Sequence, residues 1–200
     1  MILFCGDPHG HFGHIIDAVQ EHQPAAVILL GDLQAQRPLE VELASILDKT
    51  EVWFIHGNHD TDSEADHDNI FSSKLANRNL HGRVVEIAGQ RIAGLGGVIF
   101  SVDYERLQKQ RADILVTHEA PSSHPHGFAI DELASRMGVS KAIHGHHIAQ
   151  LDYSAERTRL GFDAFGVGFR GIIDQDGLRR TEDVVWKSLF GKSPQYDHAE

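Results

Sequence analysis

The stretch VWFIHGNHD, from Val52 to Asp60, decides the fold class of this chain. It begins as an apolar run typical of a strand and ends in an amide, an imidazole and a carboxylate, on Asn58, His59 and Asp60. In α/β sheets, ligands bind just beyond the carboxyl ends of the strands. We therefore expect a ligand site where this run ends.

Four other apolar runs end in polar residues in the same way. The residues that follow them are GDPHG (6–10), GD (31–32), His118 and HGHH (144–147). Five strand ends that carry aspartate, asparagine and histidine predict one convergent polar site.

The spacing of the first three motifs indicates a parallel sheet. Apolar residues recur at helical spacing over 12–19, and 25–30 is uniformly apolar, as is typical of a strand buried on both faces. Two crossovers of nearly equal length therefore separate Asp7, Asp32 and Asn58. Because right-handed βαβ units return each strand in the same direction, we expect all three side chains at one edge of the sheet.

The remaining elements are predicted from periodicity and turn signals. Residues 38–47 are expected to form a helix, and 60–79 a long surface connection with one helical turn near 70–75. Further along we expect, in order, a hairpin at 83–87 and 90–95, a helix at 101–111, a strand at 113–117, a helix at 128–137, a strand at 141–143, a second and largely antiparallel sheet over 150–174, and a short helix at 181–190.

Length and composition favour one cytoplasmic domain. With 200 residues, 41% of them hydrophobic, the chain can bury a full core, so we expect a single domain over residues 1–200. The single cysteine, Cys5, cannot form an intrachain disulfide, and no leader or membrane span precedes the first strand. We therefore expect a cytoplasmic protein without a membrane partner.

The net charge argues against one class of partner, and the histidine content favours metal chemistry. A formal net charge of −11 argues against nucleic acid as a partner, because phosphate backbones are held by clustered lysine and arginine. The chain also has 15 histidines, and histidine is both the commonest metal ligand and the usual acid–base side chain.

Mixed carboxylate and imidazole side chains suit Mn²⁺, Fe²⁺ or Zn²⁺. Asp32 follows the middle strand and is the natural bridge between two ions, since one carboxylate has two oxygens. Asp7 and His9 are two residues apart, so in an extended segment both point to one side and can chelate the same ion. Two ions about 3.5–4 Å apart generate a bound hydroxide at neutral pH and clamp the oxygens of a phosphoryl group. The residues that remain for the second ion are Asn58, His118 and His146.

In this order, GDPHG, GD, GNHD, THE and HGHH resemble the motifs of the calcineurin-like metallophosphoesterase superfamily over residues 6–147. The resemblance implies an α/β fold of two packed mixed β-sheets flanked by helices, an αββα sandwich. It also implies a phosphoric ester hydrolase with two divalent ions, in which a metal-bridging hydroxide attacks phosphorus in line. Carried over motif by motif, the metal ligands are Asp7, His9, Asp32, Asn58, His118 and His146, and the catalytic residues are His59, which approaches the leaving group, and Asp60.

The chain departs from the family pattern at two places. The family often ends its last motif in another ligating histidine, where this chain has Ile148; His144 or His147 could fill the open position. The protein-phosphatase branch carries a phosphate-gripping arginine after its second motif, and this chain has none there; Arg37 or Arg170 could substitute. The second departure argues against protein-phosphatase activity.

Three functions fit these observations. The leading hypothesis is a phosphomonoesterase that acts on a small or flexible phosphorylated substrate. The second is a phosphodiesterase or nuclease, because residues 79–97 are similar to RNA-lariat-debranching-type members. The third is a metal-binding scaffold for protein interactions, against which the retained His59 argues.

Overall fold

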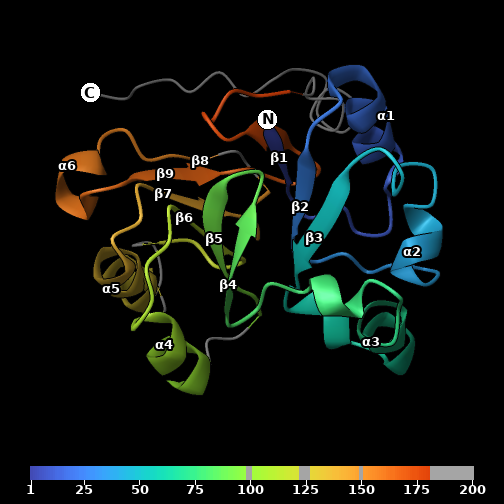
Figure 1. The fold of residues 1–200 in the computed structure, drawn as a ribbon. Helices are drawn as coiled ribbons and strands as arrows, with labels where there is room; N and C mark the ends of the chain where they lie inside the picture. The colour runs from blue at the N-terminus through green and yellow to red at the C-terminus, as the bar shows by residue number, and fades with distance from the viewer. Residues whose placement is uncertain (98–100, 122–126, 149–150, 181–200) are drawn as a thin grey trace.

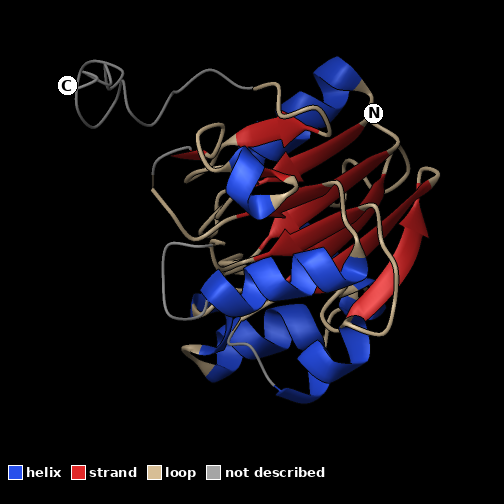
Figure 2. Cartoon of the chain, turned by 90° about the vertical axis from the view of Figure 1, so that its left-hand side faces the viewer, coloured by secondary structure: helices blue, strands red, loops and turns tan. Residues whose placement is uncertain are grey.

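The computed structural model describes residues 1–97, 101–121, 127–148 and 151–180. Two β-sheets pack face to face, with α1, α2 and α3 outside one sheet and α4, α5 and α6 outside the other (Figure 1). Viewed from the side of the second group, helices lie in front of the strands (Figure 2). The expected fold of two packed mixed sheets flanked by helices is confirmed. The helices are α1 Gly13–His22, α2 Leu39–Glu42, α3 Glu64–Phe71, α4 Ser101–Leu107, α5 Gly127–Met137 and α6 Arg157–Leu160.

The first sheet has the strand order β10-β1-β2-β3. Its strands are β1 Ile2–Cys5, β2 Ala26–Leu30, β3 Glu51–Ile55 and β10 Ile172–Asp174. β1, β2 and β3 are parallel, as the two crossovers predict, and β10 adds to β1 in the antiparallel direction.

The second sheet has the strand order β4-β5-β6-β7-β9-β8. Its strands are β4 Arg83–Ile87, β5 Gln90–Leu95, β6 Ile114–Thr117, β7 Lys141–His144, β8 Leu151–Asp152 and β9 Asp163–Gly166. β4 and β5 form the predicted hairpin, and β5, β6, β7 and β9 are parallel.

Alternation along the strands builds two separate cores around the first sheet. On β2, Val27 and Leu29 face the helix layer, where they pack with residues such as Ile15 of α1. The neighbouring Ile28 and Leu30 face the other sheet. A third core lies between the second sheet and α4 and α5. Burying each such side chain contributes about 1.5–3 kcal/mol, so both faces of the first sheet stabilise the fold.

Three predictions about secondary structure were wrong. Residues 150–174 do not form a second, antiparallel sheet, because β9 runs parallel to β7 and β10 joins the first sheet. α2 ends at Glu42 and the chain continues in turns, although the predicted apolar stripe is buried up to Ile46. The helix α3 begins at Glu64, capped by the Ser63 side chain, earlier than the helical turn that we expected. The helix predicted at 181–190 lies outside the described residues.

Among the described residues, no helix is both long enough and apolar enough to cross a membrane.

Candidate metal centre

The polar motifs follow the carboxyl ends of β1, β2, β3, β6 and β7, and several of their residues have a left-handed backbone. φ is +35° at Asp7, +43° at His9, +49° at Asp32 and +67° at His146. This conformation costs non-glycine residues about 1–3 kcal/mol, so it persists only where surrounding contacts enforce it. The four side chains that we predicted as ligands are therefore held in place by sharp turns of the chain.

The glycines of these motifs allow the side chains to approach closely. A Cβ on Gly31 would lie 2.5 Å from Nδ1 of His118, and a Cβ on Gly57 would lie 2.1 Å from Oδ1 of Asp32. Both distances are far below van der Waals contact. Glycine is required at these two positions because the predicted ligands occupy the space that a larger residue would fill.

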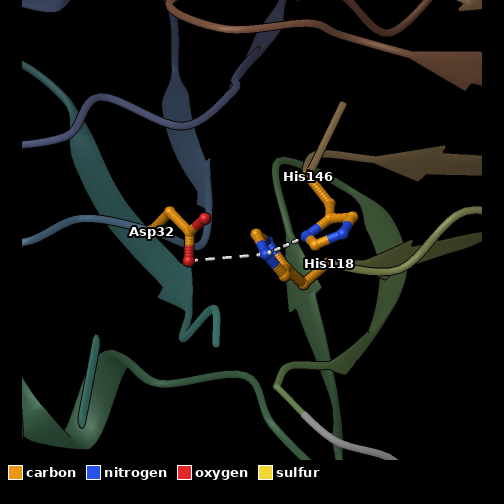
Figure 3. A group of neighbouring side chains, drawn as sticks. All are labelled: Asp32, His118 and His146. Atoms are coloured by element: carbon orange, nitrogen blue, oxygen red, sulfur yellow. Dashed lines mark hydrogen bonds and ion pairs between the residues drawn. The ribbon is translucent and has the colours of Figure 1, made fainter. Parts of the chain in front are cut away.

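One group of side chains converges on a single point. Single ligand atoms of Asp32, His118 and His146 all lie within 4.8 Å of one another (Figure 3). Nε2 of His118 and Nδ1 of His146 are 3.1 Å apart, and Oδ1 of Asn58 is 2.9 Å from the first and 3.1 Å from the second. The Nδ1 of His118 donates to the carbonyl oxygen of Leu30 at 2.8 Å, which directs Nε2 toward the cluster.

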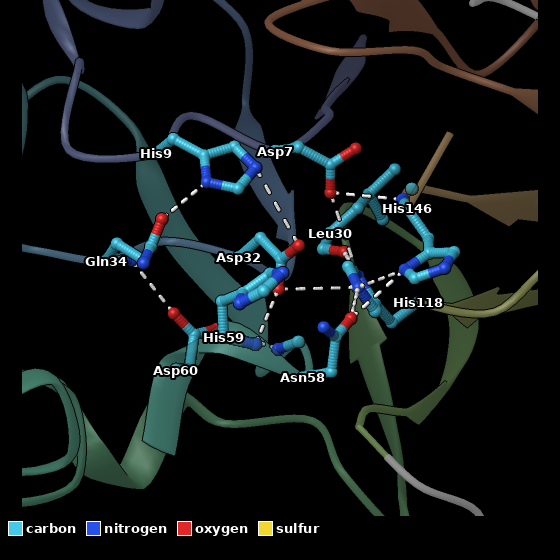
Figure 4. Close-up of polar contacts among 12 residues, drawn as sticks. Asp7, His9, Leu30, Asp32, Gln34, Asn58, His59, Asp60, His118 and His146 are labelled. Carbon is cyan, nitrogen blue, oxygen red and sulfur yellow. Dashed lines mark hydrogen bonds and ion pairs between the residues drawn. The ribbon is translucent and has the colours of Figure 1, made fainter. Parts of the chain in front are cut away.

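His9 lies on the other side of Asp32 from His118 (Figure 4). Oδ2 of Asp32 is 3.7 Å from Nε2 of His9, whereas Oδ1 of Asp32 is 3.4 Å from Nε2 of His118. Oδ1 of Asp7 accepts the backbone N–H of His146 at 3.1 Å. The two oxygens of the buried Asp32 carboxylate thus face two different candidate ligands, His9 and His118.

The residues present fit divalent cations. Oδ2 of Asp7 is buried and has no hydrogen-bond partner among the described residues, although buried polar atoms are nearly always paired. Burial raises the pKa of Asp7 to about 7, and a cation beside this carboxylate would offset that effect. A mixture of carboxylate, amide and imidazole ligands suits metals such as manganese, iron and zinc.

Without a cation, Asp32 and His118 form a buried ion pair. Burial lowers the pKa of His118, but the hydrogen bond and charge of Asp32 outweigh burial and raise it to about 9. Burial raises the pKa of Asp32, but the interactions with His118 outweigh burial and lower it to about 2. A metal ion at this position must therefore displace the proton of His118.

His59 is exposed at the edge of the centre. Its backbone N–H donates to Oδ1 of Asp32 at 3.0 Å, and its Nδ1 lies 2.6 Å from Oδ2 of Asp62. The hydrogen bond with Asp62 raises the pKa of His59. The ring of His59 lies 6.0 Å from that of His9, so a group bound at the centre would be within its reach.

The sequence profile of the calcineurin-like phosphoesterase family matches residues 1–150. The chain belongs to this family. An uncharacterized protein of Haemophilus influenzae is 39% identical over 219 aligned positions, which cover 88% of this chain and 95% of the relative. Members of the family are metal-dependent, which agrees with the cluster of Asp32, His118 and His146.

Solved structures of low sequence identity share the fold. A protein of Thermus thermophilus has a TM-score of 0.63 at 15% identity and covers 90% of this chain and 95% of its own. A second protein from the same organism has a TM-score of 0.55 at 19% identity, with 97% of this chain and 86% of its own covered. A 5'-nucleotidase of Candida albicans has a TM-score of 0.51 at 11% identity, with 86% of this chain and 46% of its own covered.

In this phosphoesterase, Asp60 does not face the centre. Its side chain is fully buried and accepts the backbone N–H groups of Gly57 at 2.7 Å and of Gln34 at 2.9 Å. Burial raises the pKa of Asp60. A carboxylate in this position cannot touch substrate, so its geometry fits a positioning role better than the catalytic role expected from the sequence. Through these two hydrogen bonds, Asp60 connects the loop that follows β2 to the loop that follows β3.

Gln34 belongs to the phosphoesterase site but was not predicted. Its Oε1 lies 2.5 Å from Nδ1 of His9, which leaves Nε2 of that ring facing Asp32. A side chain that holds the second nitrogen of a ligating histidine fixes the orientation of the ring. A signal was available, because Gln34 follows Asp32 at the same spacing at which His9 follows Asp7.

Two proposed substitutes for missing family residues are engaged elsewhere. His144 is fully buried, with Nδ1 at 2.8 Å from the carbonyl oxygen of Gly145 and Nε2 at 2.8 Å from the hydroxyl of Tyr153. It is therefore not placed to ligate a metal. Arg37 is paired with the carboxylate of Glu42.

The last motif ends at Ile148, which is 72% exposed, and the ring of His147 lies 5.5 Å from that of His146.

Proposed function

We propose that this phosphoesterase is a phosphomonoesterase that uses two divalent ions, manganese, iron or zinc, bridged by Asp32. The observation that carries the proposal is the divergence of the two oxygens of Asp32, one toward His9 and the other toward His118. Asp7 and His9 would hold one ion, and Asn58, His118 and His146 the other. The orphaned buried oxygen of Asp7 supports the first of these sites.

The residues around the ions would have separate roles in the reaction. Bound ions would supply an activated water and stabilise charge on the phosphoryl oxygens. His59, held by Asp62 and close to His9, would donate a proton to the oxygen of the leaving group. Asp60 and Gln34 would keep the second and third motifs in register, since both lie in one hydrogen-bonded chain that ends at His9.

The charge of the chain supports a small substrate. A net charge of −11 repels a polyanion such as duplex DNA or RNA, whereas one phosphoryl group can be accepted by two cations. We also place the substrate in the cytoplasm, since the lone Cys5 is buried and free.

A phosphodiesterase or nuclease is the second candidate. It is favoured by the hairpin of β4 and β5, which comes from the debranching-like segment 79–97.

Parallel assays with a monoester and a diester test the proposal. The protein loaded with Mn²⁺ should hydrolyse 4-nitrophenyl phosphate faster than bis(4-nitrophenyl) phosphate, and Asp32→Asn should lose activity on both. A faster rate on the diester would favour the phosphodiesterase. Metal binding without hydrolysis of either ester would favour the third candidate, a protein-interaction scaffold.

A further inference from the structure

The loop from β9 to β10 carries Arg170 to the edge of the metal centre. This loop packs on the first motif, because the N–H of Gly6 donates to the carbonyl oxygen of Gly171 at 3.0 Å. A Cβ on Gly6 would lie 2.2 Å from the carbonyl oxygen of Gly168, so the contact is close. The position of Arg170 is thus tied to that of Asp7 and His9.

One nitrogen of the Arg170 guanidinium group is not satisfied by any described residue. Its Nε is buried and has no hydrogen-bond partner within the described part of the chain. By contrast, Arg37 faces the carboxylate of Glu42, and Arg180 faces that of Asp174. No ion pair of Arg170 is formed within the described part of the chain, so its guanidinium is free to bind an anion from outside the chain.

Ring contacts place this guanidinium beside the centre but not within it. The guanidinium carbon of Arg170 lies 4.8 Å from the centroid of the Phe169 ring, in a cation–π contact. The Phe169 ring lies 5.3 Å from the ring of His9, which in turn lies 6.0 Å from that of His59. The Phe169 ring therefore lies between the guanidinium of Arg170 and the ring of the expected ligand His9.

His14 adds a second unsatisfied group to this region. Its Nε2 is buried and has no partner among the residues described. Burial, together with the smaller effects of the charges of Arg170 and His11, lowers the pKa of His14 to about 4, against the effect of Asp17. His14 is therefore uncharged at neutral pH, so Arg170 and not His14 supplies positive charge in this region.

We propose that Arg170 forms a subsite for a second anionic group of the substrate. The preferred substrate is then a phosphomonoester whose leaving group carries a carboxylate or another phosphate. The scissile phosphoryl group is not the partner, because the Phe169 ring separates the guanidinium from His9. This inference rests on the proposed phosphomonoesterase function.

Binding of two stable phosphonates tests the subsite without hydrolysis. Calorimetry of the Mn²⁺-loaded protein should show that 4-carboxybenzylphosphonate binds roughly tenfold more tightly than benzylphosphonate, as one charge-assisted hydrogen bond allows. Arg170→Gln should remove this preference and leave the affinity for benzylphosphonate within about twofold of the parent. Arg37→Gln, which removes an arginine already paired with Glu42, should leave the preference intact.

Equal binding of the two phosphonates by the parent would overturn the subsite, and so would an equal loss for both in Arg170→Gln. If thermal unfolding shows that Arg170→Gln is not folded, Arg170→Met decides, because it keeps an apolar stem beside Phe169 without a charge or a donor, and the preference must fall in it. Hydrolysis of phenyl phosphate and 4-carboxyphenyl phosphate is measured separately. A preference in binding without hydrolysis of either ester supports the subsite and contradicts the phosphomonoesterase.

Discussion

Individual side chains at this centre do three different things. The two oxygens of Asp32 face His9 and His118. The side chain of His59 is exposed at the edge of the centre, whereas that of Asp60 is fully buried. Sequence position alone does not separate these roles, because His59 and Asp60 are neighbours in the chain. The direction of each side chain separates them: the carboxylate of Asp60 accepts two backbone N–H groups.

His59→Ala should lower turnover of an alkyl phosphate by roughly 10²–10⁴-fold, the usual contribution of general acid catalysis. Metal content should not change, because the side chain of His59 contacts Asp62 and not the cluster. The loss should be smaller for an aryl phosphate, whose leaving group scarcely needs a proton. Steady-state rates on both esters, with elemental analysis of the variant, check this. Equal losses on the two esters would argue against a proton donor.

Secondary-structure elements deliver the ligands through tight turns at their carboxyl ends. The strands that lead into the motifs could be predicted, because strands buried on both faces are uniformly apolar and the crossovers are short. The pairing of 150–174 could not be predicted, because β9 and β10 join different sheets through partners distant in sequence. Gln34 repeats after Asp32 the spacing of His9 after Asp7, but it was missed because an amide that orients a histidine is not itself an expected metal ligand.

Gly57→Ala tests the turn after β3. The new Cβ would lie 2.1 Å from Oδ1 of Asp32, so this carboxylate must move away from the position between the two ligand groups. We expect metal affinity to fall by at least about tenfold, the size of effect seen when the orientation of a ligand is lost. Gly13→Ala is the matched control, because its Cβ would meet no atom within 4 Å. Metal titration of both variants should separate them; equal affinities would show that Asp32 tolerates the shift.

The molecule as a whole links metal binding to pH. In the metal-free protein the pKa of Asp7 is raised to about 7 and that of His118 to about 9, so each of these two groups keeps its proton to a higher pH in the folded state than in the unfolded state. The contribution of these two groups to the free energy of unfolding should therefore fall as pH rises from about 4 toward 9, whereas His14, His56 and His144, whose pKa values are lowered, act in the opposite direction only below about pH 6.5. Bound metal competes with the same protons, so its stabilising effect should increase over this range.

Thermal unfolding from pH 6 to pH 8.5, with Mn²⁺ or with a chelator, measures this linkage. The difference between the two melting temperatures should widen as pH rises. A constant difference would show that neither Asp7 nor His118 gives up a proton when metal binds.

Titration of metal-free protein with Mn²⁺ is the most direct test of the bridged dinuclear centre. The account predicts two ions per chain bound in two separate steps, the weaker at Asp7 and His9, where Ile148 is exposed and His144 is engaged with Tyr153. Asp32→Asn should weaken both steps, and Ile148→His should bring them closer together if its side chain turns toward the metal. Binding of a single ion per chain by the parent would contradict the bridge. Binding of two ions by Asp32→Asn with the affinities of the parent would contradict it as well.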